Sequence, residues 1–213
     1  VPGDFLKKIP AQPPQLAEPF DNIFADFVKL VPDSMTHWQH PRFFAYFSSN
    51  AAPASMLAEQ LANAISAQCM LWQTSPAATE LETAMIDWLR QALAVPENFR
   101  GVIQDTATSS TLAAVLTMRE KALNWRGTEE GLAGMPTLRI YASEQTHSSI
   151  DKAVRLAGIG QNNLVKVKMD SNWAMCPDSL QSAIETDRTN GLVPAGVIGC
   201  IGGTSIGASD RLD

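Results

Sequence analysis

The chain has 213 residues, of which 45% are hydrophobic and 18% are charged, so it is long enough to bury one large core. Its net charge of −6, with neither a basic cluster nor an apolar run of roughly 18 residues, excludes a general nucleic-acid binder and a membrane-spanning protein. Cys69, Cys176 and Cys200 lie far apart in the sequence, which favours reduced thiols in the cytoplasm over a disulfide framework or a metal site.

The N-terminal part combines an extended arm with an apolar helix. Residues 1–20 are rich in proline and are expected to be extended. A stripe of apolar side chains at helical spacing follows, formed by Phe20, Ile23, Phe24, Phe27, Val28 and Val31. Such a helix covers either the core of its own domain or the surface of a partner subunit, and the pattern alone leaves both open.

The rest of the chain is first helical and then alternating. Residues 51–72 and 78–96 are expected to form helices. Strands are then expected at 101–104, 138–142, 164–168 and 195–201, with helices between them at 109–124, 148–157 and 178–187. This alternation predicts an α/β fold with a mostly parallel sheet. The sequence stops at Asp213, where a further helix is expected, and is therefore interpreted as a fragment.

Two segments carry candidate chemistry. In "GVIQDTATSSTLAAVL", residues 106–110 lie where a strand is expected to meet a helix. The free N–H groups of a helix start bind phosphate well, although the same residues could form an ordinary cap that binds nothing. In "SEQTHSSIDKAVRLAG", His147, one of only three histidines, lies at the start of a helix. The simplest structural interpretation is that a neighbouring serine caps the helix and that His147 is an exposed residue beside it.

One apparent motif is set aside. Residues 203–207 fit the G-x-S-x-G pattern of serine hydrolases. Gly202 lengthens the glycine run, and Asp210 and Arg211 interrupt any apolar helix beyond it. The histidine that the hydrolase order requires after the serine and the acid does not follow before Asp213. Neither G-x-G-x-x-G nor G-x-x-x-x-G-K-[ST] occurs, so neither a dinucleotide nor a triphosphate is favoured.

Five segments, in this order and at about this spacing, point to one family. They are "THWQHPRFFAYF", "TSPAATELETAMIDWL", "GVIQDTATSSTLAAVL", "YASEQTHSSIDKA" and "GGTSIGASD". The chain closely resembles the pyridoxal-phosphate (PLP)-dependent aromatic L-amino-acid decarboxylases, the group II decarboxylases of the aspartate-aminotransferase fold (fold type I). The resemblance implies an N-terminal helical dimerisation segment over residues 1–75 and the first, incomplete part of the PLP-binding large α/β domain over residues 76–213. It also implies a homodimer and a C-terminal remainder of the same polypeptide.

The resemblance also implies the residues of the site. His147 matches the family's histidine that stacks on the pyridine ring of PLP, and it is the implied catalytic residue. The other implied cofactor-binding residues are Ala107, Thr108, Thr204 and Ser49. The implied substrate-pocket residues are Trp38, Tyr46, Phe47, Gln68 and Met70, of which the last two fall where the family reaches into the neighbouring subunit's site. Without the resemblance, the three aromatic side chains would be assigned to the core.

Three positions depart from the pattern of the family. Ser49, in "FAYFSS", stands where the animal enzymes have a threonine, and Gly203 stands where many members have threonine. Asp105 stands where animal members have glycine, which places a carboxylate beside a phosphate site. That carboxylate repels phosphate unless it points away or is paired.

The implied activity is the PLP-dependent decarboxylation of an aromatic L-amino acid to its amine and CO₂, a lyase reaction of cytoplasmic amino acid metabolism. None of the seven lysines matches the family's Schiff-base lysine, so this chain is expected to supply the N-terminal half of the active site. The alternatives are a truncated chain that only dimerises or binds, an aldehyde-forming relative and a histidine-specific relative. No metal, nucleic acid or membrane is expected as a partner.

Overall fold

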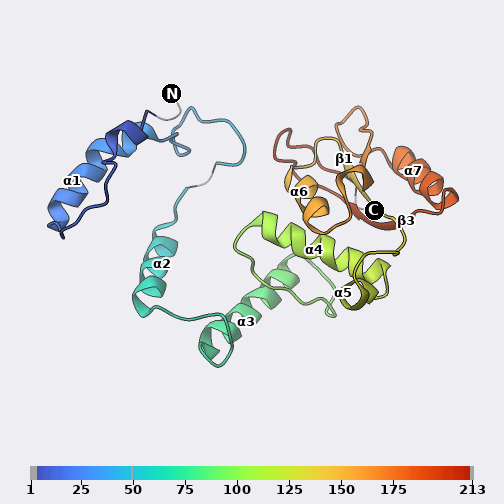
Figure 1. Cartoon of the computed structure of the whole chain (residues 1–213), viewed down its shortest axis with the longest axis horizontal. Coiled ribbons are helices and arrows are strands. Elements are labelled where there is room, and N and C mark those ends of the chain that lie inside the picture. Colours follow the sequence, from blue (N-terminus) through green and yellow to red (C-terminus); the bar gives the residue numbers. More distant parts are fainter. Residues whose placement is uncertain (1–3, 49, 212–213) are drawn as a thin grey trace. The chain divides into compact units, whose positions relative to one another are not determined.

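The computed structural model describes residues 4–48 and 50–211 (Figure 1). Contacts divide the chain into two compact units, Val1–Pro53 and Ala54–Asp213, which are described separately. The functional boundary expected between residues 75 and 76 stays a prediction. No helix in the described part of the chain is long and apolar enough to cross a membrane.

The first unit is built around one amphipathic helix. It contains η1 (Leu6–Lys8), α1 (Phe20–Leu30) and η2 (Pro32–Ser34). Helix α1 confirms the predicted helix, and the rings of Phe20, Phe24 and Phe27 stack along it with centroids 6.0 and 6.2 Å apart. None of the residues of α1 is buried, so the apolar stripe covers no core within the unit.

The second unit begins with helices and continues as an α/β fold. Its helices are α2 (Pro53–Ile65), α3 (Pro76–Ala92), α4 (Ala107–Ala122), α5 (Arg126–Glu130), α6 (Ser149–Leu156), η3 (Gln161–Asn163) and α7 (Pro177–Thr189). Proline occupies the first position of α2, α3 and α7, where its missing N–H costs no hydrogen bond. Helix α2 is shorter than predicted, because Ser66 takes a left-handed conformation with φ 53° and ends it.

The sheet has three strands in the order β2-β1-β3. Both strand pairs are parallel, as the alternating pattern predicts. They are β1 (Leu138–Ser143), β2 (Leu164–Val167) and β3 (Val193–Ile198). The strand predicted over residues 101–104 is wrong. An extended segment joins a sheet only where a neighbouring backbone completes the ladder. Here the N–H of Ile103 instead donates to Oε1 of Glu82 in α3 over 2.8 Å.

Helices cover both faces of the sheet (Figure 1). On one face, Ile140 of β1 is fully buried with Val115 of α4 and Val154 of α6. On the other face, Tyr141 packs with Val167 and with residues of α7. Successive strand residues point to opposite faces, so β1 is the central layer between two apolar clusters.

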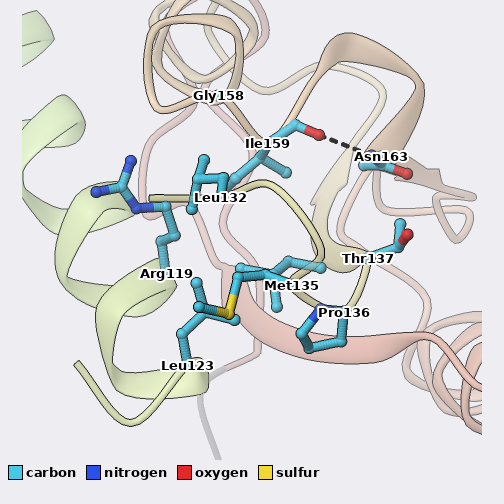
Figure 2. Close-up of a pocket in the computed structure, with 10 residues that line it drawn as sticks. Arg119, Leu123, Leu132, Met135, Pro136, Thr137, Gly158, Ile159 and Asn163 are labelled. Carbon is cyan, nitrogen blue, oxygen red and sulfur yellow. Dashed lines mark hydrogen bonds between the residues drawn. The ribbon is translucent and has the colours of Figure 1, made fainter. Parts of the chain in front are cut away.

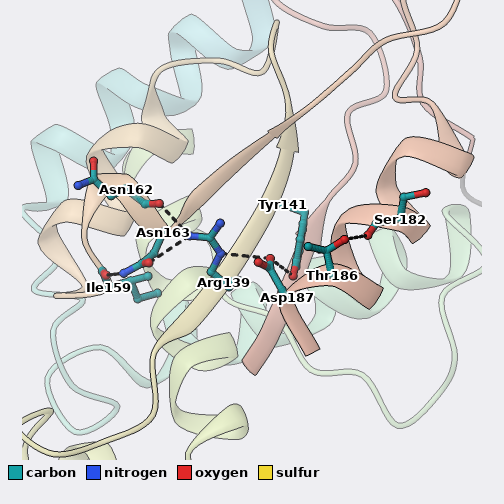
Figure 3. A network of polar contacts seen from close by, with 8 residues as sticks. All are labelled: Arg139, Tyr141, Ile159, Asn162, Asn163, Ser182, Thr186 and Asp187. Atoms are coloured by element: carbon teal, nitrogen blue, oxygen red, sulfur yellow. Dashed lines mark hydrogen bonds and ion pairs between the residues drawn. The ribbon is translucent and has the colours of Figure 1, made fainter. Parts of the chain in front are cut away.

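A buried polar network fastens α7 to the sheet (Figure 3). The hydroxyl of Tyr141 donates to Oδ2 of Asp187 over 2.7 Å, and Nε of Arg139 donates to the same oxygen over 3.1 Å. Arg139 also donates to the carbonyl oxygen of Asn162 over 2.8 Å and to Oδ1 of Asn163 over 3.2 Å. The buried carboxylate is therefore paired, as a charge in a protein interior requires.

Candidate functional site

The starts of α4 and α6 lie at the same end of the sheet. Near their other ends, Nη1 of Arg119 in the last turn of α4 donates to the carbonyl oxygen of Ala157 after α6, over 2.8 Å. Earlier in both helices, Leu112 of α4 packs into the cluster that holds Ile150 of α6. The two helices therefore run in the same direction (Figure 1). Because α6 begins just beyond β1, both helix starts lie at the carboxyl edge of the strands, where open α/β sheets bind ligands.

The start of α4 presents free hydrogen-bond donors. Thr106 caps the helix, and its Oγ1 accepts from the N–H of Ser109 over 3.2 Å. The N–H of Ser110 donates to the carbonyl oxygen of Thr106. Among the described residues, the N–H groups of Ala107 and Thr108 and the hydroxyl of Thr108 have no hydrogen-bond partner. Two free N–H groups at the positive end of a helix fit a phosphate group.

Asp105 accepts hydrogen bonds from neutral donors at this helix start, which leave its negative charge uncompensated. A hydrogen bond from the Ser109 side chain lowers the pKa of the Asp105 carboxyl, partial desolvation opposes it, and the N–H of Thr106 lowers the pKa further. The carboxylate is thus held by donors of the same turn that presents the free N–H groups. A phosphate bound there meets a negative charge in its immediate surroundings.

His147 lies at the start of α6 and takes part in its capping. It follows the end of β1, and its ring is exposed at the carboxyl edge. Its Nδ1 accepts a hydrogen bond from the backbone N–H of Ser149 over 3.2 Å, and Oγ of Ser149 lies 3.0 Å from the same nitrogen. The N-cap residue Ser148 makes no side-chain capping bond. The histidine itself therefore satisfies the first N–H of α6, while the rest of its ring faces outward.

The loop that carries Thr204 follows β3 and is closed by Asp210. The Asp210 carboxylate accepts from the N–H of Cys200 over 2.8 Å and from the N–H of Met175 over 2.6 Å. Within the loop, the N–H of Gly203 donates to the carbonyl oxygen of Ala208 over 2.8 Å. No helix follows residue 207 as far as the description reaches, at residue 211, so the strand-to-helix turn of a serine hydrolase is not formed there.

The predicted aromatic wall lies in the first unit. The rings of Trp38 and Tyr46 stack with centroids 5.7 Å apart and planes at 14°. Tyr46 has a φ of 56°, a backbone conformation that side chains other than glycine rarely adopt and that clusters at functional sites. Trp38, Tyr46 and Phe47 are exposed within the unit, so they are not part of a core. Ser49, which the resemblance assigns to the cofactor, lies outside the described residues.

Gln68 and Met70 lie in the irregular segment between α2 and α3. Both side chains are exposed, and Nε2 of Gln68 donates only to the local carbonyl oxygen of Ser66, over 3.3 Å. Neither residue contributes to the apolar clusters around the sheet. Their predicted reach into a neighbouring subunit stays a prediction.

A cavity of about 170 Å³ lies at the opposite end of β1 from His147, around Thr137 and Leu138 (Figure 2). Of the residues that line it, only Arg119 is charged. Its guanidinium already donates to Glu120 and to the carbonyl oxygen of Ala157. The cavity therefore offers no free charge to a ligand, and we assign it to imperfect packing beneath α4.

The sequence interpretation gives no role in the site to two residues that shape it. Ser149 holds the ring of His147, and Asp210 closes the loop of Thr204. Ser149 gives a sequence signal, because it lies two residues after the candidate histidine at a helix start. The contact between Asp210 and Met175 joins residues 35 positions apart, so no local pattern reveals it.

Comparison with known proteins places this geometry in a family. The family model described as the pyridoxal-dependent decarboxylase conserved domain matches residues 2–213. Tryptophan decarboxylase 2 of Oryza sativa is 36% identical over 99% of this chain. Phenylacetaldehyde synthase of Arabidopsis thaliana is 37% identical over 99% of this chain. The crystal structure of Catharanthus roseus tryptophan decarboxylase in complex with L-tryptophan superimposes with a TM-score of 0.91 at 36% identity over 100% of this chain.

The chain spans less than half the length of these proteins. It covers 43% of the rice enzyme, 44% of the Arabidopsis enzyme and 46% of the Catharanthus chain. A structure of the rice enzyme with PLP and tryptamine also superimposes, with a TM-score of 0.90. The fold is therefore that of the group II decarboxylases, of which the chain contains part.

Proposed function

The chain belongs to the pyridoxal-dependent decarboxylase family, and from this membership we propose that it supplies the N-terminal half of the active site of an aromatic L-amino-acid decarboxylase. The reaction converts the amino acid to the corresponding amine and CO₂. One observation carries the proposal for this chain. The unpartnered N–H groups of Ala107 and Thr108 lie at the same edge of the sheet as the exposed ring of His147.

The residues at this edge fit PLP. When bound, PLP supplies a ring that accepts the electron pair released as CO₂ leaves. The N–H groups of Ala107 and Thr108 and the Thr108 hydroxyl would hold its phosphate by charge-assisted hydrogen bonds. His147 would stack on the ring and serve as the catalytic residue of this half-site. Thr204, on a loop that Asp210 holds in place, would border the ring and the phosphate, and the family resemblance gives Ser49 as a further cofactor-binding residue.

The substrate pocket takes its aromatic wall from Trp38, Tyr46 and Phe47. Stacked, exposed rings suit the aromatic side chain of a substrate, because contact between the rings buries apolar surface on both sides without requiring polar partners. Gln68 and Met70 complete the pocket of a neighbouring subunit in a homodimer. A C-terminal remainder of the polypeptide carries the lysine that holds PLP. The cytoplasmic location predicted from the three dispersed cysteines belongs to the same proposal.

An aldehyde-forming reaction is the second candidate. Phenylacetaldehyde synthase of Arabidopsis thaliana is as similar to this chain as the decarboxylases are. The residues at the carboxyl edge serve both reactions equally, because both begin with an amino acid bound at PLP. The products therefore distinguish the two candidates.

Assays of the protein that contains this chain test the proposal. It is incubated with PLP and with dopa, tyrosine, tryptophan, phenylalanine or histidine, and amine, aldehyde and CO₂ are quantified. Amine and CO₂ in equal amounts from an aromatic substrate support decarboxylation, whereas aldehyde as the main product supports the second candidate. A preference for histidine contradicts the proposed substrate class. The mass of the purified polypeptide, with that of any co-purifying fragment, tests whether it is a truncated chain without activity.

A further inference from the structure

The hydrogen bonds around His147 determine which of its nitrogens carries a proton. A backbone N–H can only donate, so Nδ1, which accepts from Ser149 over 3.2 Å, uses its lone pair and has no proton. In the neutral ring, the proton is therefore on Nε2. The Ser149 hydroxyl, 3.0 Å from Nδ1, is then the donor in that contact as well. Among the described residues, Nε2 itself has no hydrogen-bond partner.

Ser149 is well placed to fix the ring. It is the first residue of α6, and only 5% of it is exposed. The next residue, Ile150, donates its N–H to the carbonyl oxygen of His147 over 3.1 Å, so the backbone of the histidine is also tied to the helix start. Before the histidine, the hydroxyls of Ser143 and Thr146 lie 3.1 Å apart and brace the turn from β1. The ring is exposed, but it is attached to the buried helix start through one nitrogen.

We propose that Ser149 is a positioning residue that fixes both the orientation and the tautomer of His147, so that the ring presents Nε2–H at the carboxyl edge of the sheet. The identity of the ligand that the ring faces rests on the proposed function. The tautomer rests only on the contacts within this chain. A ring held in one plane at the edge suits stacking on a planar cofactor. The ligand atom that meets Nε2–H must be a hydrogen-bond acceptor, such as a carboxylate oxygen.

The chain offers a conservative set of variants. Ser149→Ala removes the hydroxyl and leaves the amide at 3.2 Å as the only donor to Nδ1. Ser149→Thr restores a hydroxyl at the same position. Ser148→Ala is the matched control, because this neighbouring serine is exposed and makes no side-chain capping bond. Far-UV circular dichroism verifies that each variant retains its helices.

The tautomer is measured directly by long-range ¹⁵N–¹H NMR of protein labelled with ¹⁵N-histidine, in mildly alkaline buffer. The signals of His147 are assigned by their loss in His147→Asn. We expect the Nε2–H tautomer in the unsubstituted protein, in Ser148→Ala and in Ser149→Thr. In Ser149→Ala the hydroxyl donor is lost and only the 3.2 Å amide contact still favours this tautomer, so both ring nitrogens shift part of the way toward the values of a tautomer mixture. A predominant Nδ1–H tautomer in the unsubstituted protein, or unchanged ring nitrogens in Ser149→Ala, overturns the proposal.

Kinetics of the PLP-loaded protein add a second readout. We expect Ser149→Ala to lower kcat about tenfold, as loss of a residue that orients a functional histidine does, with KM changed much less. Ser149→Thr restores kcat, and Ser148→Ala leaves it unchanged. If the tautomer behaves as expected but no amino acid is decarboxylated, the proposed function fails and the role of Ser149 stands. If the enzyme is active but the ring nitrogens of Ser149→Ala are unchanged, the proposed function stands and the proposed role of Ser149 fails.

Discussion

The hydroxyl of Tyr141 in β1 donates to the carboxylate of Asp187 in α7 over 2.7 Å, and both side chains are buried (Figure 3). Removing this hydroxyl leaves a buried carboxylate with one donor fewer. We expect Tyr141→Phe to lower the free energy of unfolding by about 1–3 kcal/mol, measured by urea denaturation. The other tyrosine gives the control, because Tyr46 is exposed in the first unit and Tyr46→Phe removes no buried hydrogen bond.

The same pair predicts a loss of stability at alkaline pH. Burial, and then the hydrogen bond to Asp187, raise the pKa of Tyr141 well above its usual value of 10.0. A pKa that is higher in the folded state gives stability that is complete below the unfolded pKa and is lost as the pH rises above it. The difference in the free energy of unfolding between the unsubstituted protein and Tyr141→Phe therefore becomes smaller above about pH 10. A difference that stays constant through this range contradicts the assignment.

Parts of this fold follow from local sequence pattern, and other parts do not. The short apolar run at 138–142 predicts a strand, and the structure confirms it as β1. The run at 101–104 has the same apolar character, but a strand also needs a neighbour, which no local pattern provides. The pairing of Arg139 and Tyr141 with Asp187 joins residues more than 45 positions apart in the sequence.

The candidate site divides in the same way. The hydroxyl-rich residues 106–110 predict a helix start from residue type alone, and the structure confirms it with Thr106 as the cap of α4. The contact of Ser149 with Nδ1 of His147 depends on how the turn after β1 is folded, which the residue types do not determine. The assignment of His147 to a cofactor came from the resemblance to a family, and it stays a prediction.

Thr108→Val tests the phosphate site. The variant loses the unpartnered hydroxyl at the start of α4, and hydrogen bonds to charged groups contribute about 1.5–3 kcal/mol. We expect the affinity for PLP, measured by fluorescence titration, to fall about ten- to hundredfold. The control is Thr117→Val on an exposed position of the same helix, where the hydroxyl only donates to the carbonyl oxygen of Ala113. Equal PLP affinity in the two variants contradicts the assignment of the phosphate site to the start of α4.

Asp105→Asn is expected to act in the opposite direction. Its hydrogen bond from Ser109 holds the pKa of Asp105 below the usual 3.8, so the carboxylate is charged at neutral pH and in mild acid. Removing that charge beside a phosphate strengthens binding, and we expect a lower Kd for PLP and for inorganic phosphate at pH 7. The gain vanishes only in acid below the usual pKa, where the wild-type carboxyl becomes protonated as well. Glu97→Gln, which removes an exposed carboxylate elsewhere, controls for the change in net charge. An equal gain in phosphate affinity in that variant contradicts a specific role of Asp105.

The apolar stripe of α1 predicts a dimer. Phe20, Phe24 and Phe27 are at least half exposed within their own unit, which suits a helix that packs on a second subunit. Phe24→Asp places a carboxylate in that contact, and burying an unpaired charge costs several kcal/mol. We expect sedimentation to show a dimer for the unsubstituted protein and a monomer for the variant. Asn22→Asp introduces the same charge outside the stripe and should stay dimeric. An unsubstituted protein that is monomeric at every concentration refutes the predicted interface.

The lysines of this chain are expected not to hold PLP covalently. They are Lys7, Lys8, Lys29, Lys121, Lys152, Lys166 and Lys168. Lys166 pairs with Asp151 over 3.1 Å, and Lys121 lies in the last turn of α4, far from the carboxyl edge. Lys168 follows β2 at that edge and is the strictest test, because it lines an open hollow with Glu144 and Trp173.

Borohydride reduction of the 213-residue chain after incubation with PLP, followed by peptide mass analysis, measures this directly. We expect only substoichiometric labelling spread over exposed lysines, because none of the seven lysines matches the Schiff-base lysine that the family resemblance implies. Lys168→Arg should leave that background nearly unchanged. A stoichiometric phosphopyridoxyl group on Lys168, or on any one of the seven, means that this chain carries its own cofactor lysine. The assignment of the chain to one half of the active site is then wrong.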